Sequence, residues 1–183
     1  RSLSESSVDL WLDGYGETTP GRRVSIYVKG ALVAMLLDLK LIAESNGKVR
    51  LDHLMQYLWH QFGLAGKGYA KSDLLQGLFE ISGKDYTAFF NQYIDGCTPV
   101  EHEFEKLLPA FGLKLTMVQT TDPLERHLGI RLHNVQNGAP IHQIAPLSPA
   151  YRKLCVKDRI LMVDGMPFEE WKGQAGNISV APT

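Results

Sequence analysis

The chain has 183 residues, with 19 basic and 20 acidic side chains and a formal net charge of −1. This length suffices for one medium domain or two small ones. A hydrophobic content of 44% with 21% charged residues describes an ordinary globular protein and excludes a disordered one. The balanced charge gives no electrostatic reason to expect nucleic acid or an anionic membrane as partner. No apolar run is long enough to span a bilayer, so we expect a soluble protein, whether cytoplasmic, periplasmic or secreted.

The cysteines and the first residues leave the cellular compartment open. Cys97 and Cys155 lie far apart and lack metal-ligand spacing, which predicts two independent thiols. The chain opens at "RSLSESS", without an initiator methionine or a charged-then-apolar leader. We therefore expect it to be a segment of a longer precursor.

Residues 1–110 are predicted to be helical. Ser2 and Glu5 have the spacing of a capping box at the start of a short first helix. A long helix should follow at about 28–43 and end in a left-handed cap at Asn46-Gly47. Four further helices are predicted, at "RLDHLMQYLWHQFG", at "KSDLLQGLFEISG" with Ser72 as N-cap, at "KDYTAFFNQYIDG", and at "PVEHEFEKLLPAFG", where Pro109 breaks the helix.

The long helix is apolar on every face over residues 31–37. A helix of this kind must be enclosed on all sides, and the companion helices could only just do so. We therefore expect other parts of a parent protein to cover it. The aromatic side chains at helical spacing are predicted to form the core and not a substrate-binding surface; they are Trp59, Phe62, Phe79, Phe89, Phe90 and Tyr93.

From Gly112 onward the pattern changes to short strands. "LKLTMVQ" and "LGIRLHNV" alternate, "APIHQIA" predicts a short strand, and "DRILMVDGMPF" predicts a strand with a turn. We place the boundary so that a helical domain covers residues 1–111 and a small β domain covers residues 112–183. The predicted fold class is α+β, with an all-α helical subdomain followed by a small β domain.

Tyr27-Val28-Lys29-Gly30, followed by an apolar helix, resembles the Y-x-K-G element of thermolysin-like zinc aminopeptidases such as aminopeptidase N. A second amphipathic helix comes next, then "GYAKSDLLQGLFEISGKDYTAFFNQYIDG", then a PDZ-like stretch. This order is similar to that of the glycyl aminopeptidase family of zinc metallopeptidases, from about Leu3 to Phe168. The resemblance implies a C-terminal fragment of an enzyme that hydrolyses peptide or protein substrates, with the helical part of the catalytic domain preceding a PDZ-like domain.

In that family an upstream H-E-x-x-H helix and a later Glu hold zinc, and the helix Glu is the general base. This sequence has no H-E-x-x-H, since His102-Glu103 lacks the second His and His53 and His60 lie two turns apart. The resemblance therefore implies zinc in the full-length parent, with its ligands N-terminal to residue 1. For the fragment alone we expect no metal site, no bound zinc and no hydrolysis.

The resemblance assigns Tyr27 as the catalytic residue that this sequence retains. Attack of water on a peptide carbonyl creates an oxyanion, and a phenol with a pKa of roughly 10 stays protonated at neutral pH and can donate a hydrogen bond to it. Without the resemblance, a tyrosine at a helix start is a packing residue with its hydroxyl in water. Lys29 is interpreted as a solvated or dipole-neutral residue of the helix start and not as a catalyst, and Gly30 as a point of close packing.

"RHLGIRL" has the x-Φ-G-Φ pattern of the loop with which PDZ domains bind a terminal carboxylate. The peptide-binding residues would be His127, Leu128, Gly129 and Ile130, with a C-terminal peptide as ligand. "APLSPAYRKLCVKDRILMVDGMPF" resembles the helix, strand and turn that follow, with Lys157 in place of the usual Gly. After Phe168 only "EEWKGQAG" and "NISVA" can supply the groove helix and the last strand, which predicts either a truncated domain or a shortened helix.

A second interpretation is a non-catalytic adaptor, in which the helical and PDZ-like domains bind peptides without an associated zinc site. The two interpretations differ in what precedes Arg1. An H-E-x-x-H sequence with a later Glu would favour the peptidase, and its absence would favour the adaptor.

Overall fold

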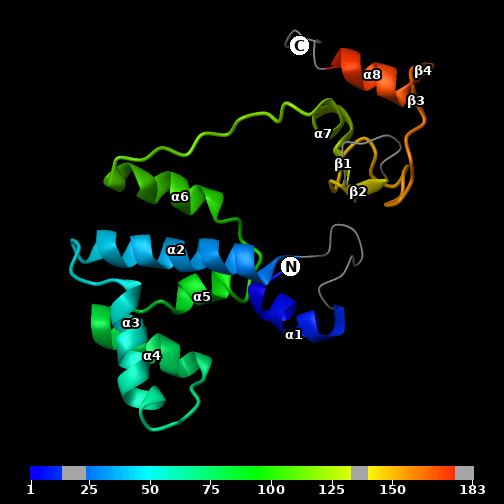
Figure 1. The fold of residues 1–183 in the computed structure, drawn as a ribbon. Coiled ribbons are helices and arrows are strands. Elements are labelled where there is room, and N and C mark those ends of the chain that lie inside the picture. Colours follow the sequence, from blue (N-terminus) through cyan, green and yellow to red (C-terminus); the bar gives the residue numbers. More distant parts are fainter. Residues whose placement is uncertain (14–23, 133–139, 176–183) are drawn as a thin grey trace. The chain divides into compact units, whose positions relative to one another are not determined.

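A computed structural model describes residues 1–13, 24–132 and 140–175 (Figure 1). These residues form two compact units, a helical one that ends at Thr116 and a second one that begins at Met117. The chain is α+β: helices precede a small unit that contains all the strands of the described residues. None of the described helices combines the length and the apolar character that a membrane crossing requires.

The described residues of the first unit are mainly helical. In chain order they are α1 (Leu3–Asp13), α2 (Ile26–Glu44), α3 (Leu51–Leu58), the π-helical turn η1 (Trp59–Gly63), α4 (Lys71–Ser82), α5 (Thr87–Tyr93), α6 (Glu101–Leu107) and the 3₁₀ turn η2 (Leu108–Phe111).

Local sequence signals set most of these helix ends. At the start of α1 the Ser2 hydroxyl accepts the Glu5 N–H at 3.1 Å and the Glu5 carboxylate accepts the Ser2 N–H at 3.3 Å, which confirms the capping box. After α2, Asn46 and Gly47 have positive φ, as predicted. Pro109 lies in η2, where α6 gives way to a 3₁₀ turn.

The prediction for the start of α4 was wrong. Ser72 is not the N-cap, because the helix begins at Lys71 and the cap residue is Ala70, two residues before the predicted one. The Asp73 carboxylate accepts the Ala70 N–H at 2.8 Å. The start of the helix is therefore stabilised by a carboxylate in its first turn, which accepts the N–H of the cap residue, and not by the serine hydroxyl.

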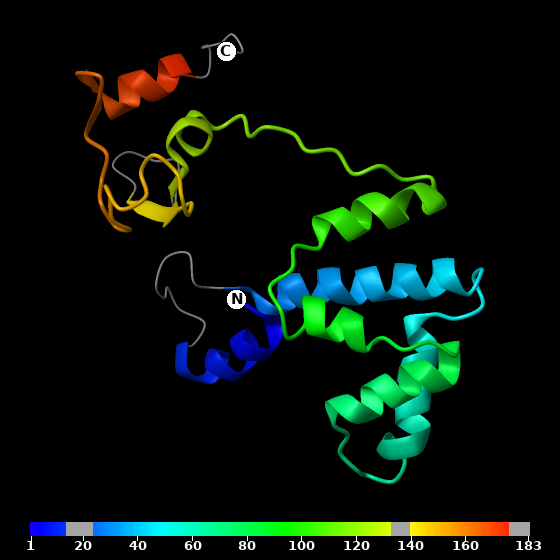
Figure 2. The same ribbon diagram turned by 180° about the vertical axis from the view of Figure 1, so that it is seen from behind.

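In the helical unit α2 runs between α6 on one side and α1 and α5 on the other (Figures 1 and 2). The core of this unit is formed by the face of α2 that these helices cover. Val33, Leu36, Leu37 and Leu41 of α2 are all buried. The companion helices contribute the other buried side chains of this cluster: Leu54, Leu58, Leu78, Tyr86, Phe89, Phe90, Tyr93, Phe104 and Leu108.

The aromatic prediction is correct for part of its list. Phe89, Phe90 and Tyr93 are buried and Phe62 is partly buried, but Trp59 and Phe79 are more than half exposed. The apolar stripe of α3 and η1 wraps further around the helix than its neighbours cover. Trp59 therefore remains at the surface, with its ring against the backbone of Gly63.

The opposite face of α2 is exposed, so the described residues do not enclose this helix on all sides; that other parts of a parent protein cover it stays a prediction. Tyr27, Val28, Ala31, Leu32 and Met35 lie on this face at helical spacing and are all exposed. We call these five residues the open face of α2. The helix is apolar all round, as expected, but the described residues bury only one side of it.

The second unit is small and contains short strands. Its elements are α7 (Pro123–Leu128), β1 (Ile130–Leu132), β2 (Ile141–Ile144), β3 (Met162–Val163), β4 (Met166–Pro167) and α8 (Phe168–Ala175). β1 pairs antiparallel with β2, and β3 pairs antiparallel with β4. The buried side chains of this unit are Leu124, Ile130, Ile141, Ile144, Ala150 and Phe168.

The strand-and-turn prediction for "DRILMVDGMPF" is confirmed at β3 and β4. Asp164 and Gly165, both at positive φ, make the tight turn between β3 and β4 that the Asp-Gly pair predicts. The alternating segment 113–119 is not a strand in the structure, because no described strand pairs with it. Parts of two other predictions, at 133–135 and at "NISVA", lie outside the described residues.

Glu44, the last residue of α2, makes a hydrogen bond and two ion pairs at the C-terminal end of this helix. The buried Tyr86 hydroxyl donates to the Glu44 carboxylate at 3.1 Å, and the ammonium groups of Lys40 and Lys84 lie 2.8 and 3.2 Å from it. Burial raises the pKa of Glu44, but the hydrogen bonds from Lys40, Lys84 and Tyr86 and the Lys40 charge outweigh burial, and the net pKa lies below 4.5. Burial and the adjacent Glu44 charge raise the pKa of the Tyr86 hydroxyl, which therefore remains a donor.

We expect Glu44→Gln to lower the free energy of unfolding by about 1–2 kcal/mol at neutral pH, because a buried hydroxyl and two partly exposed cations lose an anionic partner. A carboxyl whose pKa is depressed on folding stabilises the protein above its unfolded pKa, and this contribution is lost as the pH falls through the folded pKa. The difference in unfolding free energy between the wild-type chain and Glu44→Gln, measured by urea unfolding, should therefore become smaller as the pH falls toward about 3. Glu80→Gln, on the exposed Gln76–Glu80 pair, is the control and should change little. An equal loss in both variants would contradict this account.

Candidate functional site

Tyr27 lies in the first turn of α2, where the Ser25 hydroxyl caps the helix by accepting the Val28 N–H at 3.3 Å. Its side chain is 64% exposed, at one end of the open face of α2. The ring is therefore not packed into the core of the helical unit. A phenol in this position can reach a group that approaches the open face.

The two residues near Tyr27 have no contact that suggests catalysis among the interactions described. The Lys29 ammonium, at the start of α2, donates to the backbone carbonyl of Arg1 at 3.0 Å in an exposed contact that ties the chain before α1 to α2. A Cβ added to Gly30 would meet nothing within 4 Å, so this glycine makes no close packing contact in the structure. Neither residue adds a catalytic group to Tyr27.

The described residues do not fit a zinc site. They contain no group of three His, Cys, Asp or Glu side chains that could hold a metal ion. His102 instead lies 3.3 Å from the Glu105 carboxylate, and the His53 ring accepts the Arg50 N–H at 3.0 Å.

The predicted carboxylate-binding residues lie at the junction between α7 and β1. His127 is exposed and Leu128 is partly buried at the end of α7, Gly129 follows at φ +68°, and Ile130 begins β1 with a fully buried side chain. The Gly129 N–H donates to the Glu125 carbonyl at 3.1 Å. A carboxylate that binds this N–H would have to replace a hydrogen bond that closes the helix.

Gly129 also makes a close backbone approach. A Cβ at this position would lie 2.3 Å from the Ser148 Cβ and 3.2 Å from the Ala145 Cβ. The Gly129 carbonyl accepts the Ala145 N–H at 2.7 Å, which holds the chain after β2 against the junction. The residue must therefore be glycine both for its left-handed backbone and for the space that Ser148 occupies.

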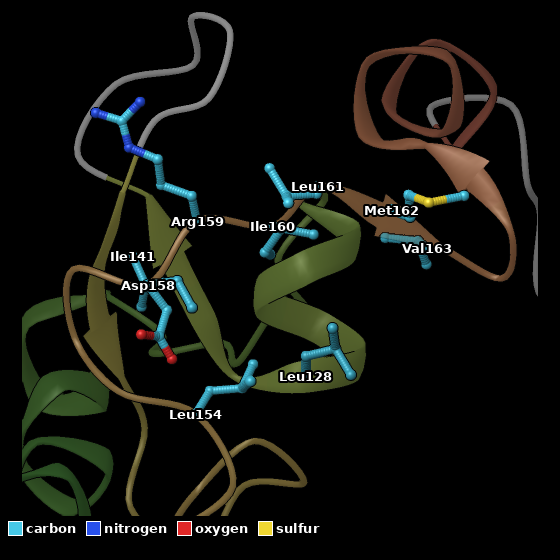
Figure 3. A pocket seen from close by; sticks show the side chains of 9 residues that line it. All are labelled: Leu128, Ile141, Leu154, Asp158, Arg159, Ile160, Leu161, Met162 and Val163. Atoms are coloured by element: carbon cyan, nitrogen blue, oxygen red, sulfur yellow. The ribbon is translucent and has the colours of Figure 1, made fainter.

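A pocket of about 450 Å³ opens beside this junction (Figure 3). Leu128 comes from the end of α7, Ile141 from β2, and most of the remaining wall from the segment 158–163. The Asp158 carboxylate accepts the Cys155 N–H at 2.8 Å, and Figure 3 shows the Arg159 guanidinium directed away from the apolar side chains. The lining residues are Leu128, Ile141, Leu154, Asp158, Arg159, Ile160, Leu161, Met162 and Val163.

Up to Arg159 the segment that forms this wall pairs with the chain at β2, through a bridge between Pro140 and Arg159 and a 2.8 Å hydrogen bond from the Ile141 N–H to the Asp158 carbonyl. Beyond Arg159 one edge of the segment has no strand partner among the described residues. β3 pairs only with β4 there, through Met162 with Pro167 and Val163 with Met166. Leu161 and Met162 are 75% and 60% exposed although they line the pocket. An apolar pocket beside an unpaired strand edge can accept an extended chain, with backbone hydrogen bonds along the edge and a side chain in the pocket.

Sequence reasoning found Leu128 but missed the rest of the pocket. Ile141, Leu154, Ile160 and Val163 were recognised only as strand or helix residues. The continuous apolar run at 160–163 was the available signal, because a strand that is apolar on both faces needs a partner on each face. The fold had to be known before these side chains could be placed beside Leu128.

The fold thus defines a chain of two parts, a helical unit and a small unit in which short strands and helices surround an apolar pocket. The PDZ domain family model matches residues 117–175, the stretch from the start of the second unit to the end of α8. This part of the chain is PDZ-like, and PDZ domains are peptide-binding modules. Comparisons with curated proteins and with solved structures give no match.

We expect Gly129→Ala to destabilise the second unit by about 3 kcal/mol, from about 1–2 kcal/mol for the left-handed backbone and the remainder from the clash with Ser148. Gly165→Ala is the matched control, because φ is also positive there but a Cβ would meet nothing within 4 Å. It should cost only the backbone strain. Thermal unfolding of both variants measures the difference, and equal losses would disprove the close approach.

Proposed function

We propose that this chain acts on peptides and that its PDZ-like unit binds an extended peptide segment. One observation carries this proposal: the stretch that matches the PDZ domain model contains an apolar pocket beside residues 160–163, one edge of which has no strand partner among the described residues. The bound segment would lie along 160–163 and insert an apolar side chain between Leu128 and Ile160.

The junction residues would hold the end of such a peptide. His127 is exposed and can donate a hydrogen bond to a terminal carboxylate, while the backbone around Gly129 and Ile130 lies beside it. The Gly129 N–H would have to leave the Glu125 carbonyl to take part. Peptides with a free C-terminus and their amidated counterparts, compared on one array, would separate end recognition from binding along the strand edge.

Leu161→Asp should weaken peptide binding at least about tenfold, because it places a charge in an apolar pocket without a partner. The residue is 75% exposed, so the fold should tolerate the change. Leu147→Asp makes the same replacement at a residue that is 92% exposed and does not line the pocket. Fluorescence polarisation with the best peptide from the array measures both. Equal affinities for the two variants would place the peptide elsewhere.

A second candidate function follows from the other unit. We propose that the helical unit belongs to the catalytic domain of a zinc-dependent aminopeptidase-like metallopeptidase, with Tyr27 as the donor to the oxyanion. Supporting this is the exposure of Tyr27 at the mouth of an apolar helix whose open face has no cover among the described residues. The metal ligands would lie N-terminal to residue 1, as the resemblance to the peptidase family implies.

Tyr27→Phe, in a protein that carries this chain together with the metal-binding sequence, should lower kcat about 10²–10³-fold. Zinc content should not change, because the phenol is not a ligand. Tyr69→Phe, which removes an exposed hydroxyl from a tyrosine packed on Phe62, is the control. Steady-state peptide hydrolysis and metal analysis provide the two measurements, and an unchanged kcat would end the assignment of Tyr27.

The adaptor remains the alternative to this second candidate and shares its peptide-binding unit. In the adaptor the open face of α2 would bind a protein partner, and Tyr27 would have no catalytic role. The presence of H-E-x-x-H with a later Glu before Arg1 in the parent gene would favour the peptidase, and its absence would favour the adaptor.

A further inference from the structure

The chain between β2 and β3 carries a dense group of cations. Arg152, Lys153, Lys157 and Arg159 are all exposed, and Asp158 is the one acidic residue between them. Four basic side chains and one acidic side chain give residues 152–159 a net charge of +3, in a chain whose net charge is −1. We call the four basic residues the basic cluster.

The basic cluster has no anionic partner among the described residues, since none of its four side chains makes an ion pair there. The Arg152 guanidinium lies 5.5 Å from the centre of the Tyr151 ring. The Asp158 carboxylate accepts the Cys155 N–H at 2.8 Å, which directs this anion toward the backbone. Like charges that are held together without a counter-charge attract an anionic partner.

The backbone beneath the cluster is held in place although it is strained. The Lys157 N–H donates to the Ile141 carbonyl, and the Ile141 N–H donates to the Asp158 carbonyl, both at 2.8 Å. Arg152 and Lys157 have φ of +64° and +78°, a region that glycine adopts freely and other residues rarely adopt. Among the described residues Lys157 makes no ion pair that would offset this strain, and strained residues of this kind cluster at ligand-binding sites.

The cluster borders the pocket of the PDZ-like unit. Arg159 belongs to the lining, and Lys153 and Lys157 directly precede two other lining residues, Leu154 and Asp158. The Arg159 guanidinium is directed away from the apolar side chains in Figure 3, so its charge lies at the edge of the pocket. Adjacent Cα atoms lie about 3.8 Å apart, and salt at 0.1 M screens charges over about 10 Å. The cluster therefore acts on a peptide that occupies the pocket.

We propose that the PDZ-like unit selects acidic peptides. An apolar side chain of the peptide enters the pocket, and Asp or Glu side chains beside it pair with the basic cluster. This inference rests on the proposed peptide-binding function of the same pocket and names its class of ligand. A nucleic acid would satisfy the cations through its phosphates but has no aliphatic side chain for the pocket, so the two features together favour a peptide.

Fluorescence polarisation of the full chain with four labelled heptapeptides tests the selection. Three have a central leucine flanked on each side by three glutamates, three glutamines or three lysines, and the fourth has a serine between the glutamates. In about 20 mM NaCl the glutamate–leucine peptide should bind at least about tenfold more tightly than the lysine peptide. It should exceed the serine peptide by a similar factor, because serine leaves the pocket unfilled. In about 500 mM NaCl its advantage over the glutamine peptide should fall below about twofold, because salt screens exposed charges.

Charge reversal in the chain locates the pairing. The Lys153→Glu/Arg159→Glu variant should bind the glutamate–leucine peptide at least about fivefold more weakly and the glutamine peptide as before. Both residues are exposed, so the fold should tolerate the changes. The control, Lys48→Glu/Lys67→Glu, makes the same charge change at two exposed residues of the helical unit and should bind like the wild-type chain.

A glutamate–leucine peptide that binds no more tightly than the glutamine and lysine peptides would overturn the inference, as would equal losses in the two charge-reversal variants. Displacement of this peptide by a single-stranded oligothymidylate of the same charge, as readily as by unlabelled peptide, would also overturn it, because the cluster would then bind any polyanion. In each case, binding of the array peptides that Leu161→Asp weakens would leave the proposed peptide-binding function standing. Absence of binding by every peptide, those of the array included, would reject both.

Discussion

The PDZ-like unit depends on one backbone junction, the left-handed turn at Gly129. This residue lies between the end of α7 and the start of β1, and its carbonyl accepts the Ala145 N–H, while the neighbouring Leu128 carbonyl accepts the Ala150 N–H at 3.3 Å. Ser148 lies so near that any side chain at Gly129 would collide with it. The junction thereby places its two neighbouring side chains differently: Ile130 is buried in the core, and Leu128 lines the pocket. The position of the pocket is thus a consequence of the turn.

The helical unit follows a different constraint, the one-sided burial of α2. Leu36 and Leu41 are almost completely enclosed, whereas Leu32 and Met35 on the other side are exposed. A helix of this composition is stable in water only because one face is so well packed; its open face is an apolar surface of the kind that marks an interaction site. Tyr27 shares that surface, so the proposed oxyanion donor and the adaptor's binding surface are alternative uses of one face.

Sequence reasoning succeeded where the cause is local. The capping box at Ser2 and Glu5, the left-handed end of α2 and the Asp164-Gly165 turn depend on a few neighbouring residues, and the structure contains all three. It failed where tertiary packing decides. Ser72 was predicted to cap α4, but the Asp73 carboxylate accepts the N–H of the actual cap residue, Ala70. Segment 113–119 has no strand partner among the described residues. The open face of α2 could not be distinguished from the buried face, because both are apolar. Of the candidate site, Leu128 and Gly129 were visible through the loop pattern, but the wall at 158–163 needed the folded chain.

The most direct measurement of the central claim, that the PDZ-like unit engages an extended peptide at this pocket, is a nuclear magnetic resonance titration of the labelled chain. On addition of a bound array peptide, we expect the amide resonances of 160–163, Ile141 and Leu128 to shift together, with those of α2 to α6 unchanged. Shifts confined to the helical unit, or spread over the second unit without involving 160–163, would contradict the account.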